Sequence, residues 1–113
     1  NGAFFNNHRI RVSKKSEINN CLFVTGEKVV NNIDLLYRKS GCASLDMAYV
    51  ASGRYDGYFQ NNLNLWDVAA GIVLVKEAGG IINHIDLSDN TNIKIIASSA
   101  DINSKLLEKL NNF

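Results

Sequence analysis

Short apolar runs separated by polar residues predict β-strands in the first third of the chain. Residues 4–5 and 10–12 are mostly apolar and flank a polar stretch at 6–8, a pattern typical of a β-hairpin. Residues 22–25 are apolar and β-prone, so they predict a third strand. Residues 27–39 favour a short helix that runs into a strand, although two consecutive asparagines weaken the helical pattern.

Apolar residues at helical spacing predict three helices farther along the chain. Residues 40–53 are mostly apolar and predict a largely buried helix that Gly53 ends in a left-handed conformation. A second helix is expected from Asp67 to Ala78, with Gly79-Gly80 as its stop. Residues 101–112 carry one apolar stripe and predict a last helix.

Further strands are expected between these helices. Residues 55–59, 81–85 and 93–97 predict strands, whereas 61–65 are interpreted as a loop and 88–90 as a turn. Strands and helices therefore alternate along the chain, which predicts an α/β fold.

Composition limits the classes of function that remain. The chain has 113 residues, the size of one domain, and 46% of them are hydrophobic. Its formal charge of +1 argues against binding driven mainly by electrostatic attraction to nucleic acid or anionic lipid. No apolar run approaches the roughly 18 residues that a membrane span needs.

The termini and cysteines indicate the setting. The chain opens without Met, inside what the pattern predicts to be a hairpin, so a piece of a longer protein is expected. The first residues lack a secretion signal, and Cys21 and Cys42 are too few for a disulfide scaffold. These features favour a reducing, cytoplasmic location.

The segment Leu65–Gly71 holds the strongest candidate for chemistry. Asp67 follows Trp66 at the expected start of a helix, where it can act as a cap while Trp66 anchors the core. Alternatively, Asp67 points into a cleft and binds a hard cation such as Mg²⁺, which prefers oxygen ligands. Gly71 within the helix is explained by close packing on a sheet. Spacing alone leaves both interpretations of Asp67 open.

Other candidates have simpler interpretations. His8 and His84 lie far apart, without a Cys or carboxylate at metal-ligand spacing. Cys42 could react as a thiolate at a helix start, but no histidine lies near it in sequence to act as a base. Lys14-Lys15 is interpreted as a solvated basic patch.

Three blocks of sequence, in order, resemble the inositol monophosphatase family. The most specific is Trp66-Asp67-Val68-Ala69-Ala70-Gly71 followed by Val75-Lys76-Glu77-Ala78-Gly79-Gly80, which is similar to the carboxyl-terminal signature of that family. Residues 40–58 are similar to the helix and strand that precede the signature, and residues 2–13 resemble the central hairpin. The blocks together cover most of the chain.

This resemblance implies a mixed sheet flanked by helices, the carboxyl-terminal half of a layered αβαβα sandwich. It implies that Asp67 is a catalytic residue that binds Mg²⁺ and faces the substrate. It also implies that the backbone of Gly41, Cys42 and Ala43 meets the alcohol portion of a phosphate monoester, where unpaired helix amides can serve oxygen atoms. A homodimer is implied as well.

Three departures from the family pattern qualify these implications. Gln60 stands where inositol phosphatases usually carry a Glu that contacts sugar hydroxyls, so a charged acceptor is replaced by a neutral amide. Residues 27–39 are shorter than the corresponding segment of the family. The chain has no proline, so it lacks the Asp-Pro-x-Asp-Gly-Thr segment of the amino-terminal half that carries most metal and phosphate ligands.

Three hypotheses follow for residues 1–113. In the first, they are the carboxyl-terminal portion of a Mg²⁺-dependent phosphatase that acts on inositol phosphate, and they are inactive without the amino-terminal half. In the second, the substrate is a sugar or nucleotide bisphosphate, an alternative that Gln60 keeps open. In the third, the chain is a non-catalytic interaction module.

Overall fold

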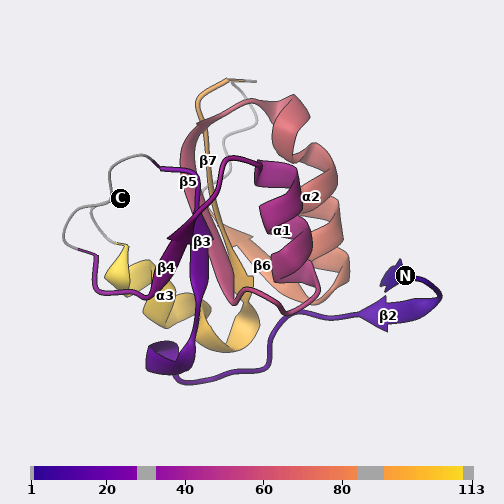
Figure 1. Cartoon of the computed structure of the whole chain (residues 1–113), viewed down its shortest axis with the longest axis horizontal. Coiled ribbons are helices and arrows are strands. Elements are labelled where there is room, and N and C mark those ends of the chain that lie inside the picture. The colour runs from indigo at the N-terminus through magenta and orange to yellow at the C-terminus, as the bar shows by residue number, and fades with distance from the viewer. Residues whose placement is uncertain (1, 28–32, 84–90, 111–113) are drawn as a thin grey trace.

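The computed structural model describes residues 2–27, 33–83 and 91–110, and a five-strand mixed sheet forms its centre (Figure 1). The strands are β3 (Phe23–Thr25), β4 (Tyr37–Lys39), β5 (Gly57–Leu63), β6 (Gly80–Asn83) and β7 (Ile93–Ser99). The helices are α1 (Ala43–Ala51), α2 (Leu65–Glu77) and α3 (Asn103–Lys109), with 3₁₀ turns η1 (Ile18–Asn20) and η2 (Ala100–Ile102). A separate hairpin, β1 (Ala3–Phe5) and β2 (His8–Ile10), precedes them. The predicted α/β fold with a mixed sheet flanked by helices is confirmed.

The sheet has the strand order β4-β3-β5-β7-β6. β3 runs parallel to β4 and β5, whereas β7 runs antiparallel to β5 and β6. α1 connects β4 to β5, and α2 connects β5 to β6. These two helices lie side by side on one face of the sheet, and α3 lies on the other (Figure 1).

The side chains of the central strands point alternately to the two faces of the sheet, so a hydrophobic core forms on each face. Successive side chains of a strand point to opposite faces, so Tyr58 packs beneath α1 and α2 while Phe59 packs toward α3. Ile95 and Ile96 of β7 divide in the same way, and all four side chains are almost completely buried. The face that carries Tyr58 is the one that builds the candidate site.

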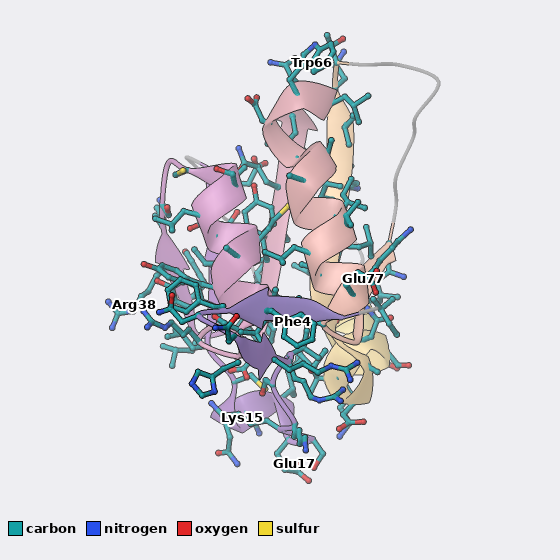
Figure 2. All side chains as sticks on the ribbon, turned by 90° about the vertical axis from the view of Figure 1, so that its right-hand side faces the viewer. Phe4, Lys15, Glu17, Arg38, Trp66 and Glu77 are labelled. Atoms are coloured by element: carbon teal, nitrogen blue, oxygen red, sulfur yellow. The ribbon has the colours of Figure 1, made fainter. Side chains whose placement is uncertain are left out.

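The predicted amino-terminal hairpin is confirmed. Asn6 and Asn7 form its turn with φ angles of 51° and 66°, the left-handed conformation that two-residue hairpin turns require. Figure 2 shows the hairpin lying across the ends of α1 and α2 that are opposite to Trp66. Its side chains Phe4 and Phe5 are exposed, at 60% and 68%.

The interpretation of residues 61–65 as a loop is wrong. β5 continues to Leu63, which pairs with Ile93 and is buried. The register shifts between Gln60 and Leu63, where Asn62 takes a φ of 58°. A β-bulge of this kind accommodates polar residues in a strand whose pairing with β7 is fixed by tertiary contacts.

Two expectations for the start of α2 are also wrong. The helix begins at Leu65 with Asn64 as its N-cap, so Asp67 lies in the first turn and is not the cap. Trp66 is 87% exposed and does not anchor the core. Figure 2 shows it at the end of α2 that lies farthest from the hairpin. The buried, apolar face of α2 includes Val68 and Val75. Trp66 lies on another side of the helix and is therefore exposed.

The expectation that Gly71 packs on the sheet is wrong, because Gly71 packs against the neighbouring helix α1. A Cβ at this position would lie 2.7 Å from Sδ and 2.9 Å from Cβ of Met47 in α1. Helix α1 buries one face, where Met47 lies, whereas Leu45 on another face is 47% exposed. The prediction of a largely buried helix therefore holds only for the face that carries Met47. Gly53 follows α1 with a φ of 80°, as predicted for the helix stop.

A buried carboxylate fastens the segment before β3 to the start of β5. Asp56 is 2% exposed, and its Oδ2 accepts hydrogen bonds from the backbone nitrogen of Leu22 at 2.7 Å and from Nζ of Lys15 at 3.3 Å. Lys14 and Lys15 are both exposed, as expected of a solvated patch, and Lys15 in addition forms an ion pair with Asp56.

The last helix is shorter than predicted, because the turn η2 precedes α3. Ile102, Leu106 and Leu110 of the predicted stripe are buried against the sheet. The predicted turn at 88–90, His84, and part of the stretch at 27–39 lie outside the described residues. Within the described part of the chain, no helix has the length and apolar character needed to cross a membrane.

Candidate functional site

A pocket of about 420 Å³ lies where α1 and α2 begin. All five residues proposed from the sequence line it: Gly41, Cys42, Ala43, Gln60 and Asp67. They come from the start of α1, the middle of β5 and the first turn of α2. The structure thus brings together residues that are up to 26 positions apart (67 minus 41) in sequence.

The pocket has four further lining residues: Ser44, Asn62, Leu63 and Trp66. Sequence reasoning assigned the stretch 61–65 to a loop and Trp66 to the core, so it did not consider these positions as part of a site. The available signal was closeness in sequence to Gln60 or Asp67 for Asn62, Leu63 and Trp66, and to Ala43 for Ser44.

A serine holds the loop that leads into α1. The Ser40 nitrogen donates to the Thr25 carbonyl oxygen at 2.9 Å, and Ser40 Oγ accepts from the Cys42 nitrogen at 3.3 Å. A Cβ at Gly41 would meet no atom within 4 Å, so this residue faces open space. These hydrogen bonds anchor the loop directly after β4, and the backbone of the loop faces the pocket.

Behind this loop lies the buried carboxyl group of Asp46. It is 2% exposed, and its Oδ2 has no hydrogen-bond partner among the described residues. Burial raises the pKa of Asp46, and a hydrogen bond from the Ser40 side chain opposes that rise. Sequence reasoning missed this residue, although a lone acidic residue in an otherwise apolar helix was a signal for it.

Asp67 is exposed and faces the pocket. Its backbone nitrogen donates to the carbonyl oxygen of Asn64 at 3.0 Å, which closes the first turn of α2. In the described ranges its carboxylate forms no ion pair. A carboxylate in this state is available to a cation that prefers oxygen ligands.

The acidic groups of the described residues do not by themselves complete a metal centre. Within residues 2–27, 33–83 and 91–110, no group of three or more His, Cys, Asp or Glu side chains is placed to hold a metal ion. Asp67 fits the role of one carboxylate ligand, and the remaining ligands of such a site would have to come from elsewhere.

Gln60 lines the pocket from β5, and the buried Tyr58 lies next to it on the same strand. They are two positions apart on the strand, so both point to the face that carries α1 and α2. The Tyr58 hydroxyl donates a hydrogen bond to Oε1 of Gln60 at 2.5 Å. Burial, together with the carboxylate of Asp46, raises the pKa of Tyr58 well above its usual value.

The two cysteines should differ strongly in reactivity. Cys42 is exposed, and hydrogen bonds from the Ser44 side chain and from nearby backbone lower its pKa, whereas burial raises the pKa of Cys21, with a further contribution from Asp56. We expect iodoacetamide to modify Cys42 about a hundredfold faster than Cys21 near neutral pH, as followed by mass spectrometry. Cys42→Ser should remove the fast phase, and equal rates for the two thiols would contradict this assignment.

The fold and the pocket together define a layered α/β protein with a pocket at the amino-terminal ends of two adjacent helices. The sequence profile of the inositol monophosphatase family matches residues 1–112. The chain therefore belongs to the inositol monophosphatase family.

Individual relatives agree with this membership. The chain is 44% identical over 103 residues to a putative Nus factor SuhB of Neisseria meningitidis, a match that covers 78% of this chain and 40% of that protein. It is 47% identical over 76 residues to an inositol-1-monophosphatase of Caulobacter vibrioides, covering 65% of this chain and 30% of that protein. The chain thus spans less than half the length of these relatives.

The fold comparison gives the same result. The extragenic suppressor protein SuhB of Bartonella henselae superposes with a TM-score of 0.83 at 39% sequence identity, over 97% of this chain and 50% of that chain. The resemblance to the inositol monophosphatase family that the sequence blocks indicated is confirmed.

Proposed function

We propose that the complete protein is a Mg²⁺-dependent phosphatase that hydrolyses phosphate monoesters of inositol or a related small polyol, and that residues 1–113 are its carboxyl-terminal portion. The observation that carries this proposal is the position of Asp67. Its exposed carboxylate lies in the same pocket as the backbone of Gly41–Ala43 and the amide of Gln60. Family membership supports the class of reaction.

Each residue of the pocket has a distinct role in this proposal. Asp67 holds a magnesium ion through its carboxylate. When bound, magnesium ions in such sites activate water and stabilise the charge on the phosphoryl group and the leaving oxygen. The backbone of Gly41, Cys42 and Ala43 orients the alcohol portion of the substrate, with the amides of Gly41 and Ala43 as the candidate donors, because the Cys42 nitrogen already donates to Ser40 Oγ. Gln60 contacts the same portion from β5.

The amino-terminal half of the same protein is the proposed partner of this chain. It would supply the other metal and phosphate ligands, since Asp67 is a single carboxylate, and residues 1–113 alone would be inactive. The large exposed apolar side chains Phe4, Phe5 and Val73, each at least 60% exposed, support a covering partner. A homodimer of the complete protein is part of the same proposal.

Metal removal tests the proposal directly. We expect the complete protein to release phosphate from inositol monophosphate in the presence of Mg²⁺, and EDTA to lower the rate by about a hundredfold or more, because the reaction would lose several kcal/mol of charge stabilisation. Excess Mg²⁺ should restore the rate. Absence of phosphate release, or a rate that EDTA leaves unchanged, would overturn the proposal and favour a non-catalytic interaction module.

A further inference from the structure

Three hydrogen bonds form a closed network around Cys42. The Cys42 nitrogen donates to Ser40 Oγ at 3.3 Å, and the Cys42 carbonyl oxygen accepts from the Asp46 nitrogen at 3.0 Å. The Ser40 hydroxyl group donates in turn to the Asp46 carboxyl group. Because a hydroxyl group can accept and donate at once, Ser40 connects the loop before α1 with the buried face of the helix. Ser40 and Asp46 therefore hold Cys42 from both sides.

The Ser40–Cys42–Asp46 network is attached to the central sheet. The Ser40 nitrogen donates to the Thr25 carbonyl oxygen at 2.9 Å, at the end of β3. Thr25 is completely buried, and its hydroxyl group donates to the carbonyl oxygen of Phe59 in β5. The position of Ser40 is thus set by two neighbouring strands.

The network sets the direction of a backbone amide at the pocket. A peptide group is planar and trans, so the N–H of Ala43 points opposite to the carbonyl group of Cys42. That carbonyl group points into α1, because it accepts the first hydrogen bond of the helix from Asp46. The Ala43 N–H consequently points out of the start of α1, where the pocket lies.

The side chain of Asp46 does not reach the pocket itself. Asp46 is 2% exposed, is not among the residues that line the pocket, and forms no ion pair with any described residue. Its Oδ2 has no hydrogen-bond partner in the described part of the chain, and such an unpaired, buried oxygen is unfavourable for folding. The hydrogen bond from Ser40 is the contact through which this carboxyl group acts on the loop.

We infer that Ser40 and Asp46 are positioning residues, whose hydrogen bonds hold Cys42 so that the loop from Gly41 to Ala43 binds the alcohol portion of the substrate. This inference rests on the proposed function and assigns a role to two residues that touch no substrate. The loop meets the part of the substrate that does not react. Loss of the network should therefore weaken substrate binding and leave the chemical step nearly unchanged.

Ser40→Ala in the complete protein tests the serine. It removes the acceptor of the Cys42 N–H, so KM for inositol monophosphate should rise by about fivefold or more, while kcat changes by less than about twofold. Ser40→Thr keeps the hydroxyl group and should leave KM within about twofold of the unmodified protein. An unchanged KM in Ser40→Ala, or an equal rise in Ser40→Thr, would overturn the inference.

The matched control for the serine is Ser52→Ala. Ser52 is exposed at the other end of α1, where its hydroxyl group donates to the Tyr49 carbonyl oxygen at 3.2 Å. This variant also removes one local hydrogen bond of a serine next to α1, but it should leave KM within about twofold. A rise in KM equal to that of Ser40→Ala would contradict a specific role for the network.

Asp46→Ala and Asp56→Ala separate positioning from folding stability. Both aspartates are 2% exposed, and each has one oxygen without a hydrogen-bond partner among the described residues, but Asp56 precedes β5 and does not line the pocket. Both variants should lower the midpoint of thermal unfolding, whereas only Asp46→Ala should raise KM, by about fivefold or more. Asp46→Asn keeps an oxygen acceptor for Ser40 and should hold KM within about threefold. An equal rise in KM in Asp56→Ala, or in Asp46→Asn, would overturn the role of Asp46.

Amide hydrogen exchange tests the network without any reaction, and it decides the inference if Asp46→Ala does not fold. Measured by NMR on the complete protein, the Cys42 amide should exchange about fivefold or more faster in Ser40→Ala than in the unmodified protein, and at an unchanged rate in Ser52→Ala. If the unmodified protein hydrolyses no phosphate monoester, the proposed function fails. The exchange rates then stand alone, and an unchanged rate in Ser40→Ala would show that the network does not hold the loop.

Discussion

Asp67→Asn in the complete protein is expected to lower kcat for inositol monophosphate by at least about a hundredfold while the fold remains intact. The asparagine keeps the size of the side chain but removes the negative charge that would hold a magnesium ion in the pocket. The loss in folding stability should stay below about 1 kcal/mol, because Asp67 is exposed and contributes only a favourable interaction with the start of α2. Phosphate release, calorimetric Mg²⁺ titration and thermal unfolding measure the three quantities.

Asp101→Asn is the matched control for this result. Asp101 is also an exposed carboxylate in the first turn of a helical segment, but it does not line the pocket of Asp67. Its substitution should leave turnover and Mg²⁺ affinity within about twofold of the unmodified protein. Survival of both turnover and Mg²⁺ affinity in Asp67→Asn would show that Asp67 is not a metal ligand.

Gly71→Leu is expected to destabilise the protein by about 3 kcal/mol or more. Even a Cβ at this position would approach Met47 to 2.7 Å, and Met47 is completely buried, so a larger side chain must separate α1 from α2. Because the pocket lies at the beginnings of these two helices, their separation should also raise KM for the substrate. Chemical denaturation and steady-state kinetics of the complete protein measure both effects.

Two further variants separate this packing effect from helix propensity. Ala70→Leu places the same side chain on the exposed surface of α2 and should change stability by less than about 0.5 kcal/mol. Gly71→Ala should be destabilising alone and less destabilising in a Met47→Ala background, which removes Sδ, the atom nearest to the new Cβ, but keeps the Cβ of residue 47 at 2.9 Å. Additive effects in the double variant would contradict direct contact between positions 71 and 47.

Elements with strong local signals were predicted correctly from the sequence. The turn at Asn6-Asn7 and the helix stop at Gly53 depend on conformations that only a few residue types adopt readily, so residue identity alone marks them. The boundaries of α2 and β5 were less accurate. Leu63 is buried in a strand because Ile93 pairs with it from a distant segment, and no local pattern carries that information.

The candidate site, too, was predicted only in part from the sequence. The motif around Asp67 indicated both the family and the residue, and the family is confirmed. The roles of Gly41, Cys42, Ala43, Gln60 and Asp67 remain predictions, although the structure places all five around one pocket. Asp46 was missed because its importance lies in burial, which depends on what packs around α1.

The sequence by itself determined the alternation of strands and helices, the family, and five of the nine described residues that line the pocket, because each follows from a local pattern or motif. Only the tertiary structure decided that Trp66 faces outward and that Gly71 serves helix–helix contact. These features depend on distances between segments that are remote in sequence. Such distances are fixed when the sheet pairs and α1 packs against α2, a step that no local propensity encodes.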